Sequence, residues 1–213
     1  MEKRLLEQRK RKNLTLKHKI YIFCNGPTEK NYFDELRGYH RIKKELCVIS
    51  SSHSNRLSLV KEVAETHGNI KKDKTKEIYV VFDADIMPKG RNSNPSTIKS
   101  QVDNACSQCV AKGYTAIVSN ESFELWYLLH FENINIKTHR DDLFQKVQAH
   151  ISDYEKAKFG ILEKTLPFID TAKERAIKLD ANYPQNVLRS ERNPSTNVYE
   201  LIEKIESLKS ISL

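Results

Sequence analysis

The chain has 213 residues, of which 38% are hydrophobic and 30% are charged. That balance excludes a disordered or fibrous chain, and the length suffices for a folded α/β unit with its own hydrophobic core. The longest apolar runs have the length of a strand, so the sequence predicts neither a membrane span nor a secretory leader, and we expect a cytoplasmic protein. Four cysteines do not make a disulfide scaffold in a chain of this size, and we interpret them as reduced thiols.

The net charge of +8 is concentrated at the N-terminus. Residues 1–19 hold eight Lys or Arg residues against two Glu residues, and we expect residues 1–18 to form a basic arm. Its densest run is Arg9, Lys10, Arg11 and Lys12, whose charges can neutralise the phosphates of a nucleic acid without reading its sequence. The alternative is a solvated leader that has no binding partner.

Strand-like and helical segments alternate over the first 132 residues. The run E-I-Y-V-V-F at 77–82 is apolar almost throughout, which is typical of a strand buried on both faces. The predicted strands are 19–24, 45–50, 77–82 and 115–119, and the predicted helices are 28–38, 57–68, 96–112 and 122–129. This alternation predicts an α/β fold in which a mostly parallel four-stranded sheet lies between helices.

From about residue 133 the pattern is only helical, with candidate helices at 140–150, 167–182 and 194–208. Because no linker is visible, we expect residues 133–213 to pack as a helical extension on an α/β core formed by residues 19–132. The last helix is preceded by N-P-S-T, in which Asn193 would cap the helix and Pro194 would lie in its first turn. An alternative is that the amide and hydroxyls of this block contact a substrate.

Acidic side chains follow the predicted strands at the edge where ligands gather in open α/β sheets. Asp83 and Asp85 come directly after the most apolar strand, and Glu29 follows the first strand. Positions i and i+2 of an extended segment face the same way, so the two Asp carboxylates share one space and repel unless a cation lies between them. Oxygen ligands without nearby His or Cys favour Mg²⁺ or Mn²⁺, which can activate water for hydrolysis of a phosphodiester. The alternative is a solvated pair or a helix-capping Asp.

Three further charged residues have two interpretations each. Glu124 lies in an apolar helix, F-E-L-W-Y-L-L, so it needs a partner, which is either a cation or a basic side chain of the protein. Lys89 and Arg91 lie in the loop after D-A-D, where they either hold a phosphate or are simply solvated.

Four blocks of the sequence resemble the RloB-like proteins, a Toprim-related family. They are I-Y-I-F-C-N-G-P-T-E-K-N-Y-F from residue 20, E-I-Y-V-V-F-D-A-D from residue 77, S-N-E-S-F-E-L-W-Y-L-L-H-F from residue 119 and N-P-S-T-N-V-Y-E-L from residue 193. The blocks follow the order of the family and span most of the chain.

The resemblance implies a Toprim-like core in which acidic residues after two strands hold Mg²⁺ or Mn²⁺. Carried over to this sequence, Glu29, Asp83 and Asp85 become metal ligands, and Glu124 becomes a further candidate ligand. The family implies a nuclease acting on DNA or RNA in bacterial anti-phage or abortive-infection defence, often beside an ABC- or AAA-type ATPase.

Asn25 departs from the family pattern, which has Glu at this position. An Asn side chain can coordinate a cation through its carbonyl oxygen, but it cannot take a proton. Two functions therefore remain open. Either Asn25 takes part in an active site rebuilt around Glu29, or the chain is a weakened or inactive Toprim-like subunit that binds nucleic acid or an ATPase and regulates it.

Overall fold

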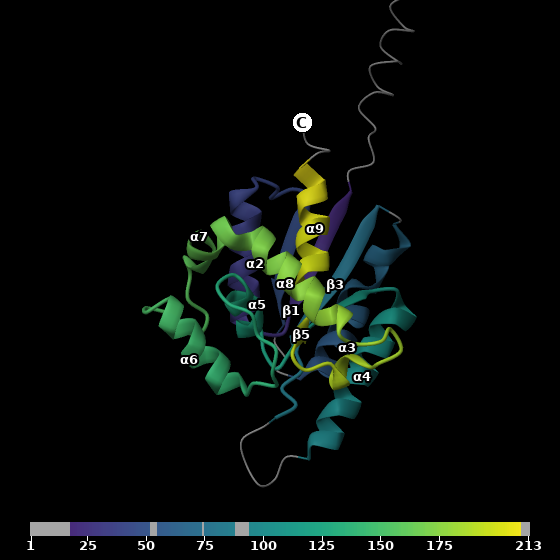
Figure 1. Cartoon of the computed structure of the whole chain (residues 1–213). Coiled ribbons are helices and arrows are strands. Elements are labelled where there is room, and N and C mark those ends of the chain that lie inside the picture. Colours follow the sequence, from purple (N-terminus) through teal and green to yellow (C-terminus); the bar gives the residue numbers. More distant parts are fainter. Residues whose placement is uncertain (1–17, 52–54, 74, 88–93, 210–213) are drawn as a thin grey trace, which may run out of the picture.

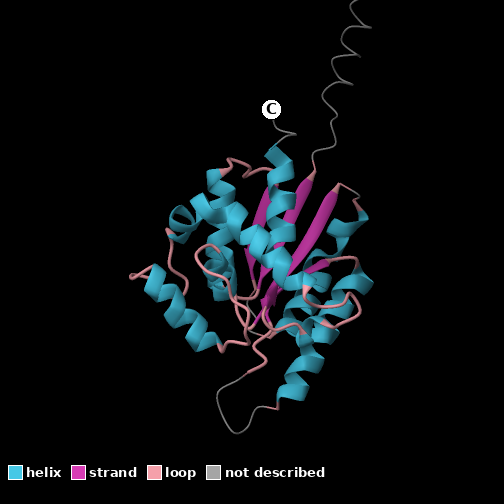
Figure 2. Cartoon of the chain, viewed as in Figure 1, coloured by secondary structure: helices cyan, strands magenta, loops and turns pink. Residues whose placement is uncertain are grey.

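A five-stranded sheet lies at the centre of the protein, with helices on both of its faces (Figures 1 and 2). The computed structural model describes residues 18–51, 55–73, 75–87 and 94–209. The basic arm with Arg9, Lys10, Arg11 and Lys12 lies outside the described residues, and so do Lys89 and Arg91. No helix within the described ranges is long and apolar enough to cross a membrane.

The order of the strands in the sheet is β2-β1-β3-β4-β5. The four predicted strands all form, as β1 (Lys19–Cys24), β2 (Leu46–Ser50), β3 (Lys76–Asp83) and β4 (Thr115–Asn120). They run parallel to one another, and Asp83 at the end of β3 pairs with Ser119 of β4. β3 lies between β1 and β4, which explains why its apolar run is buried on both faces. The carboxyl ends of these strands therefore meet at one edge.

One face of the sheet is covered by α3 (Arg56–His67) and α4 (Pro95–Lys112). Leu59, Val60 and Val63 of α3 pack there with Val102 and Ala105 of α4. Both helices begin at an Asn whose side chain accepts hydrogen bonds from backbone N–H groups of the first turn, which satisfies donors that a helix start leaves free.

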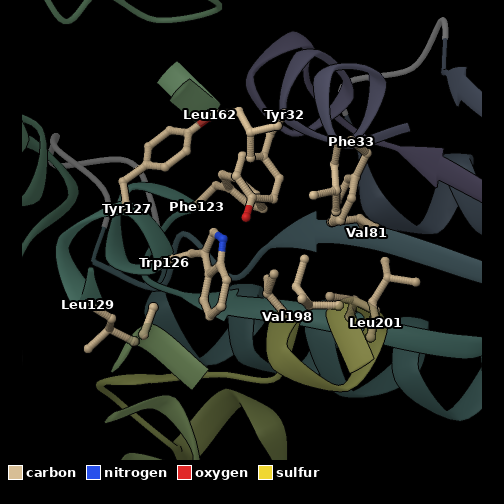
Figure 3. Packing of buried hydrophobic residues seen from close by; sticks show 14 of the residues in the cluster. Tyr32, Phe33, Val81, Phe123, Trp126, Tyr127, Leu129, Leu162, Val198 and Leu201 are labelled. Carbon is tan, nitrogen blue, oxygen red and sulfur yellow. The ribbon is translucent and has the colours of Figure 1, made fainter. Parts of the chain in front are cut away.

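The other face is covered by α2 (Pro27–Tyr39) and α5 (Glu124–Leu129), together with helices from the C-terminal third of the chain. Figure 3 shows Tyr32 of α2 among Phe123, Trp126 and Tyr127. The ring centroids of Tyr32 and Phe123 are 5.5 Å apart in an edge arrangement, a geometry that aromatic pairs prefer.

The C-terminal third contributes α6 (Arg140–His150), α7 (Ile161–Thr165), the 3₁₀ turn η2 (Leu166–Phe168), α8 (Ile169–Ala181) and α9 (Val198–Lys209). Two further 3₁₀ turns are η1 (Gly68–Lys72), which follows α3, and η3 (Arg189–Glu191), which precedes β5. Side chains such as Leu162, Val198 and Leu201 belong to the same hydrophobic cluster as Tyr32 and Trp126 (Figure 3). The helices after residue 133 thus complete the core rather than cover a finished one.

Two features of this region differ from the sequence prediction. The N-P-S-T block does not start a helix, because Ser195–Thr196 form a fifth strand, β5, that pairs antiparallel with Ser119 and Asn120 of β4. The hydroxyls of Ser119 and Thr196 are 2.9 Å apart, and Asn197 accepts a hydrogen bond from the backbone N–H of Val118 at 2.8 Å. The predicted helix 167–182 is divided into η2 and α8 near Pro167, which has no N–H to donate.

Candidate functional site

A pocket of about 170 Å³ lies at the carboxyl ends of β1 and β3. It brings together all five residues that the sequence predicts for the catalytic and metal site, along with two cations from the C-terminal third. The lining residues are Asn25, Gly26, Pro27, Thr28, Glu29, Asp83, Asp85, Phe123, Glu124, Arg140 and Lys156.

Glu29 lies in the first turn of α2, and only 4% of it is exposed. The helix starts at Gly26 and Pro27, and a Cβ atom built on Gly26 would stand 2.6 Å from Glu29 Oε2. The glycine therefore lets the carboxylate fold back over the start of the helix. Burial, with the charges of Glu124 and Asp85, raises the pKa of Glu29 to about 7.

Asp83 is the last residue of β3, and its Oδ1 atom is buried without a hydrogen-bond partner among the described residues. Burial, followed by the charges of Glu29, Asp85 and Glu124, raises the pKa of Asp83 well above its usual value. An unpaired buried carboxylate oxygen is costly, so this atom is a candidate for binding a cation.

Asp85 adopts a left-handed backbone conformation with φ of 45°, which Asp tolerates better than most residues. Its Oδ1 atom accepts a hydrogen bond from Nη1 of Arg140, the first residue of α6. The positive charge beside Asp85 in this structure is therefore the guanidinium of Arg140.

The D-A-D segment is held in place from two sides. Arg56 of α3 donates to the carbonyl oxygens of Asp83 (3.2 Å) and Ala84 (3.0 Å). On the other side, the fully buried Glu121 accepts hydrogen bonds from Met87 N–H at 3.0 Å and from Asn193 Nδ2 at 2.9 Å. Asn193 is therefore not a helix cap. Its side chain anchors the carboxylate that fixes the loop, which makes Arg56, Glu121 and Asn193 positioning residues.

Glu124 is the first residue of α5 and is 3% exposed. Both of its carboxylate oxygens accept hydrogen bonds from hydroxyls, with Ser122 Oγ at 2.6 Å from Oε2 and Tyr154 Oη at 3.1 Å from Oε1. The partners that the structure assigns are hydroxyls rather than the basic side chain weighed from the sequence. These two hydroxyls orient the Glu124 carboxylate at the pocket.

The family model described as RloB-like protein matches residues 20–205. The chain belongs to the RloB-like family. The match includes every residue that lines the pocket, and it confirms the resemblance predicted from the four sequence blocks.

No curated protein matches this RloB-like chain. A lipase/acylhydrolase from Enterococcus faecalis has a solved structure that is similar over 91% of this chain and 96% of that chain, with a TM-score of 0.35 and 12% sequence identity. A similarity this low carries no argument about activity.

The side chains of the RloB-like pocket fit a hard divalent cation in their chemistry. Four carboxylates line it, the pKa values of Glu29 and Asp83 are raised largely by burial and then by neighbouring acids, and Asp83 Oδ1 has no partner among the described residues. As the side chains stand, no three His, Cys, Asp or Glu residues in the described ranges are grouped tightly enough to hold a metal ion.

Sequence reasoning missed two residues that contribute to the site from the C-terminal third, Arg140 and Tyr154. Arg140 is the first residue of a helix whose bounds are predicted correctly. The spacing of apolar residues that predicts a helix does not indicate which loop the first side chain of that helix contacts. The missed residues lie beyond residue 133, where the alternating strand pattern ends, so no rule about strand ends applies to them.

Proposed function

We propose that this RloB-like chain is a nuclease with a Toprim-like core that uses Mg²⁺ or Mn²⁺ to hydrolyse phosphodiester bonds of DNA or RNA. The observation that carries the proposal is the convergence of Glu29, Asp83, Asp85 and Glu124 on one pocket, where Asp83 Oδ1 is buried and unpaired. Carboxylates collected at this edge of a parallel sheet suit a divalent cation, and such sites favour phosphoryl chemistry.

The residues that would hold the cation are Asp83, Asp85 and Glu29, with Glu124 as a further ligand. When bound, a divalent cation supplies charge to polarise a phosphodiester and to lower the pKa of a water molecule. Glu29, whose burial brings its pKa to about 7, can accept or donate a proton near neutral pH. Asn25 lines the same pocket, but an amide cannot transfer a proton, so proton transfer falls to Glu29.

Membership of the RloB-like family supports a role in anti-phage or abortive-infection defence with an ABC- or AAA-type ATPase partner. The basic arm with Arg9, Lys10, Arg11 and Lys12 supports a nucleic-acid target, because such a run gives salt-sensitive affinity for phosphates.

A second candidate function is a catalytically silent subunit that binds nucleic acid or the ATPase. Two observations favour it: residue 25 is Asn where the family pattern has Glu, and Arg140 is already paired with Asp85. An intact set of four carboxylates favours the nuclease instead.

Purified protein incubated with single- and double-stranded DNA and RNA distinguishes the two functions. We expect cleavage with Mg²⁺ or Mn²⁺, none with a chelator, and a loss of at least about 10²-fold in Asp83→Asn and Asp85→Asn. Asp170→Asn is the matched control, because Asp170 is exposed on α8 and pairs with Lys173. Full cleavage by both pocket variants would remove D-A-D from the mechanism, and no cleavage by the wild type under any of these conditions would favour the silent subunit.

A further inference from the structure

Two cations from the C-terminal third face the acidic pocket, although nothing in the predicted metal site requires them. Arg140 and Lys156 line it together with the carboxylates of Glu29, Asp83 and Asp85. Positively charged side chains beside a site for a divalent cation oppose metal binding unless they also bind an anion from outside the protein. How Arg140 and Lys156 are held indicates which anion this is.

Arg140 forms an ion pair with an acid of the pocket. Its guanidinium contacts Asp85, and about a third of each side chain is exposed. The pocket that Arg140 lines also holds the carboxylates of Asp83 and Glu124, so its guanidinium faces several acids and not Asp85 alone. A divalent cation held by Asp85 would compete with this ion pair, and the guanidinium would then be available at the pocket.

Lys156 is held at the rim of the pocket by a segment that is fastened to α2. Ala157 N–H donates to Thr28 Oγ1 at 3.2 Å, and Asn31 Nδ2 donates to the Ala157 carbonyl at 2.6 Å. Farther along the segment, the Glu35 carboxylate accepts hydrogen bonds from Gly160 N–H at 2.5 Å and Leu162 N–H at 2.9 Å. One helix therefore carries both Glu29 and the attachment points that place Lys156.

Lys156 itself has no hydrogen bond or ion pair with any residue that the structure describes, and it is exposed. Its neighbour Lys158 differs, because Lys158 Nζ donates to the Asp153 carbonyl at 2.6 Å and pairs with the Asp153 carboxylate at 3.1 Å. The backbone beneath Lys156 is fixed while its ammonium group is available to a ligand.

Phosphate is the anion that suits this pair of side chains. A guanidinium donates two parallel hydrogen bonds to phosphate oxygens, and a lysine ammonium adds a mobile point charge. A polynucleotide presents successive phosphates along its backbone, so one can lie beside the carboxylates while the next reaches the rim.

We propose that Arg140 and Lys156 are the phosphate-binding side of the pocket, an inference that rests on the proposed nuclease function. Arg140 neutralises Asp85 while no divalent cation is bound, and it donates to the reacting phosphate of a polynucleotide once a cation takes Asp85. Lys156 binds an adjacent phosphate. The two residues thus tie substrate binding to metal binding.

The first test measures metal binding to the free protein, without substrate. Titration calorimetry with Mn²⁺ should show about fivefold tighter binding by Arg140→Gln than by the wild type, because the competing cation is gone. Lys146→Gln is the matched control on α6, since Lys146 pairs with Glu132 at 3.0 Å outside the pocket. Unchanged or weaker Mn²⁺ binding by Arg140→Gln would overturn the role of Arg140 as the counter-ion of Asp85.

The second test measures binding of fluorescein-labelled single-stranded DNA and RNA oligonucleotides in Ca²⁺ by fluorescence anisotropy. We expect about tenfold weaker binding by Arg140→Gln and about threefold weaker binding by Lys156→Gln. Each variant should lower the slope of log affinity against log salt by about 0.7, the value for one lost phosphate contact on a single strand. Lys146→Gln and Lys158→Gln should bind as the wild type does.

We expect Arg140→Gln to bind Mn²⁺ more tightly and oligonucleotide more weakly than the wild type. These opposite changes identify Arg140 as a residue that interacts first with Asp85 and then with phosphate, since the loss of a residue that only supports the fold would weaken both affinities. If the variants bind oligonucleotide with wild-type affinity and salt slope while the wild type cleaves, this inference fails and the nuclease stands. If binding depends on Arg140 and Lys156 but the wild type cleaves neither DNA nor RNA with Mg²⁺ or Mn²⁺, the nuclease fails and the phosphate site stands.

Discussion

Gly26 determines where the Glu29 carboxylate lies, because a Cβ atom at residue 26 would stand 2.6 Å from Glu29 Oε2. The φ and ψ angles of Gly26, −134° and 161°, are extended and open to alanine, so Gly26→Ala should fold and yet displace the carboxylate. If Glu29 acts in proton transfer, we expect cleavage to fall about 10²-fold or more while the melting temperature changes by only a few degrees. Cleavage rates and thermal melts of the same preparation check this prediction.

Gly38→Ala is the matched control for that experiment. Gly38 lies in the same helix, and a Cβ atom there meets nothing within 4 Å. Because Gly38 is the last-but-one residue of α2, alanine there should stabilise the protein by at most about 0.5–1 kcal/mol and leave cleavage unchanged. Equal cleavage by Gly26→Ala and Gly38→Ala would show that the position of the Glu29 carboxylate does not matter for the reaction.

Glu29 also makes stability depend on pH. Because its pKa is about 7 in the folded protein against an ordinary value of 4.5, the group favours folding below about pH 4.5, and this contribution is lost as pH rises toward 7. The loss amounts to about 3 kcal/mol of unfolding free energy in the protein without metal. Asp83, whose pKa is also raised, adds to it in the same direction.

Urea unfolding in chelator at about pH 5 and about pH 8 measures this dependence. We expect Glu29→Gln to show a smaller fall in stability between the two pH values than the wild type, with the remainder due to Asp83. Exposed Glu65 on α3 provides the control variant Glu65→Gln, which should behave as the wild type. If the free energy of unfolding fell equally in the wild type and in Glu29→Gln between the two pH values, Glu29 would not be the source of this pH dependence.

At the scale of elements, α2 is the part that joins the acidic and basic sides of the pocket. It carries Glu29 in its first turn, and Thr28, Asn31 and Glu35 hold the segment that bears Lys156. Glu35→Ala removes the acceptor of the Gly160 and Leu162 N–H groups, so we expect their amide hydrogens to exchange faster by about tenfold. Hydrogen–deuterium exchange over residues 155–165 measures the effect.

Asp34→Asn provides the control for this prediction, because Asp34 pairs within α2 with Lys30 and Arg37 rather than with the neighbouring segment. The control should leave exchange over residues 155–165 unchanged. Unchanged exchange in Glu35→Ala would show that other contacts hold the Lys156 segment on α2.

At the scale of the whole molecule, patterns that are local in the sequence predict the four parallel strands of the sheet. The features that these patterns do not predict depend on contacts between segments far apart in the sequence. Apolar runs predict β1 to β4, and the rule that ligands gather at strand ends correctly brings Glu29, Asp83 and Asp85 together. The strand β5 has only two residues, and it exists because its backbone pairs with β4. Arg140 reaches Asp85 across 55 residues of sequence, a contact that depends on how α6 packs and that no local pattern contains.

The same distant packing bears on the predicted boundary at residue 133. Val198, Leu201, Ile202 and Ile205 of α9 are fully buried in the cluster that holds Tyr32 and Trp126. A chain ending at residue 132 would expose that cluster and the β4 edge that β5 covers. We therefore expect residues 18–132 alone to show no cooperative unfolding by circular dichroism. In the whole chain, Leu201→Ala should lower the free energy of unfolding by about 2–5 kcal/mol. Ile177→Ala, at an exposed position of α8, should change stability by less than about 0.5 kcal/mol. Cooperative unfolding of the 18–132 segment would instead establish it as an independent domain, with the C-terminal helices as an addition to a finished core.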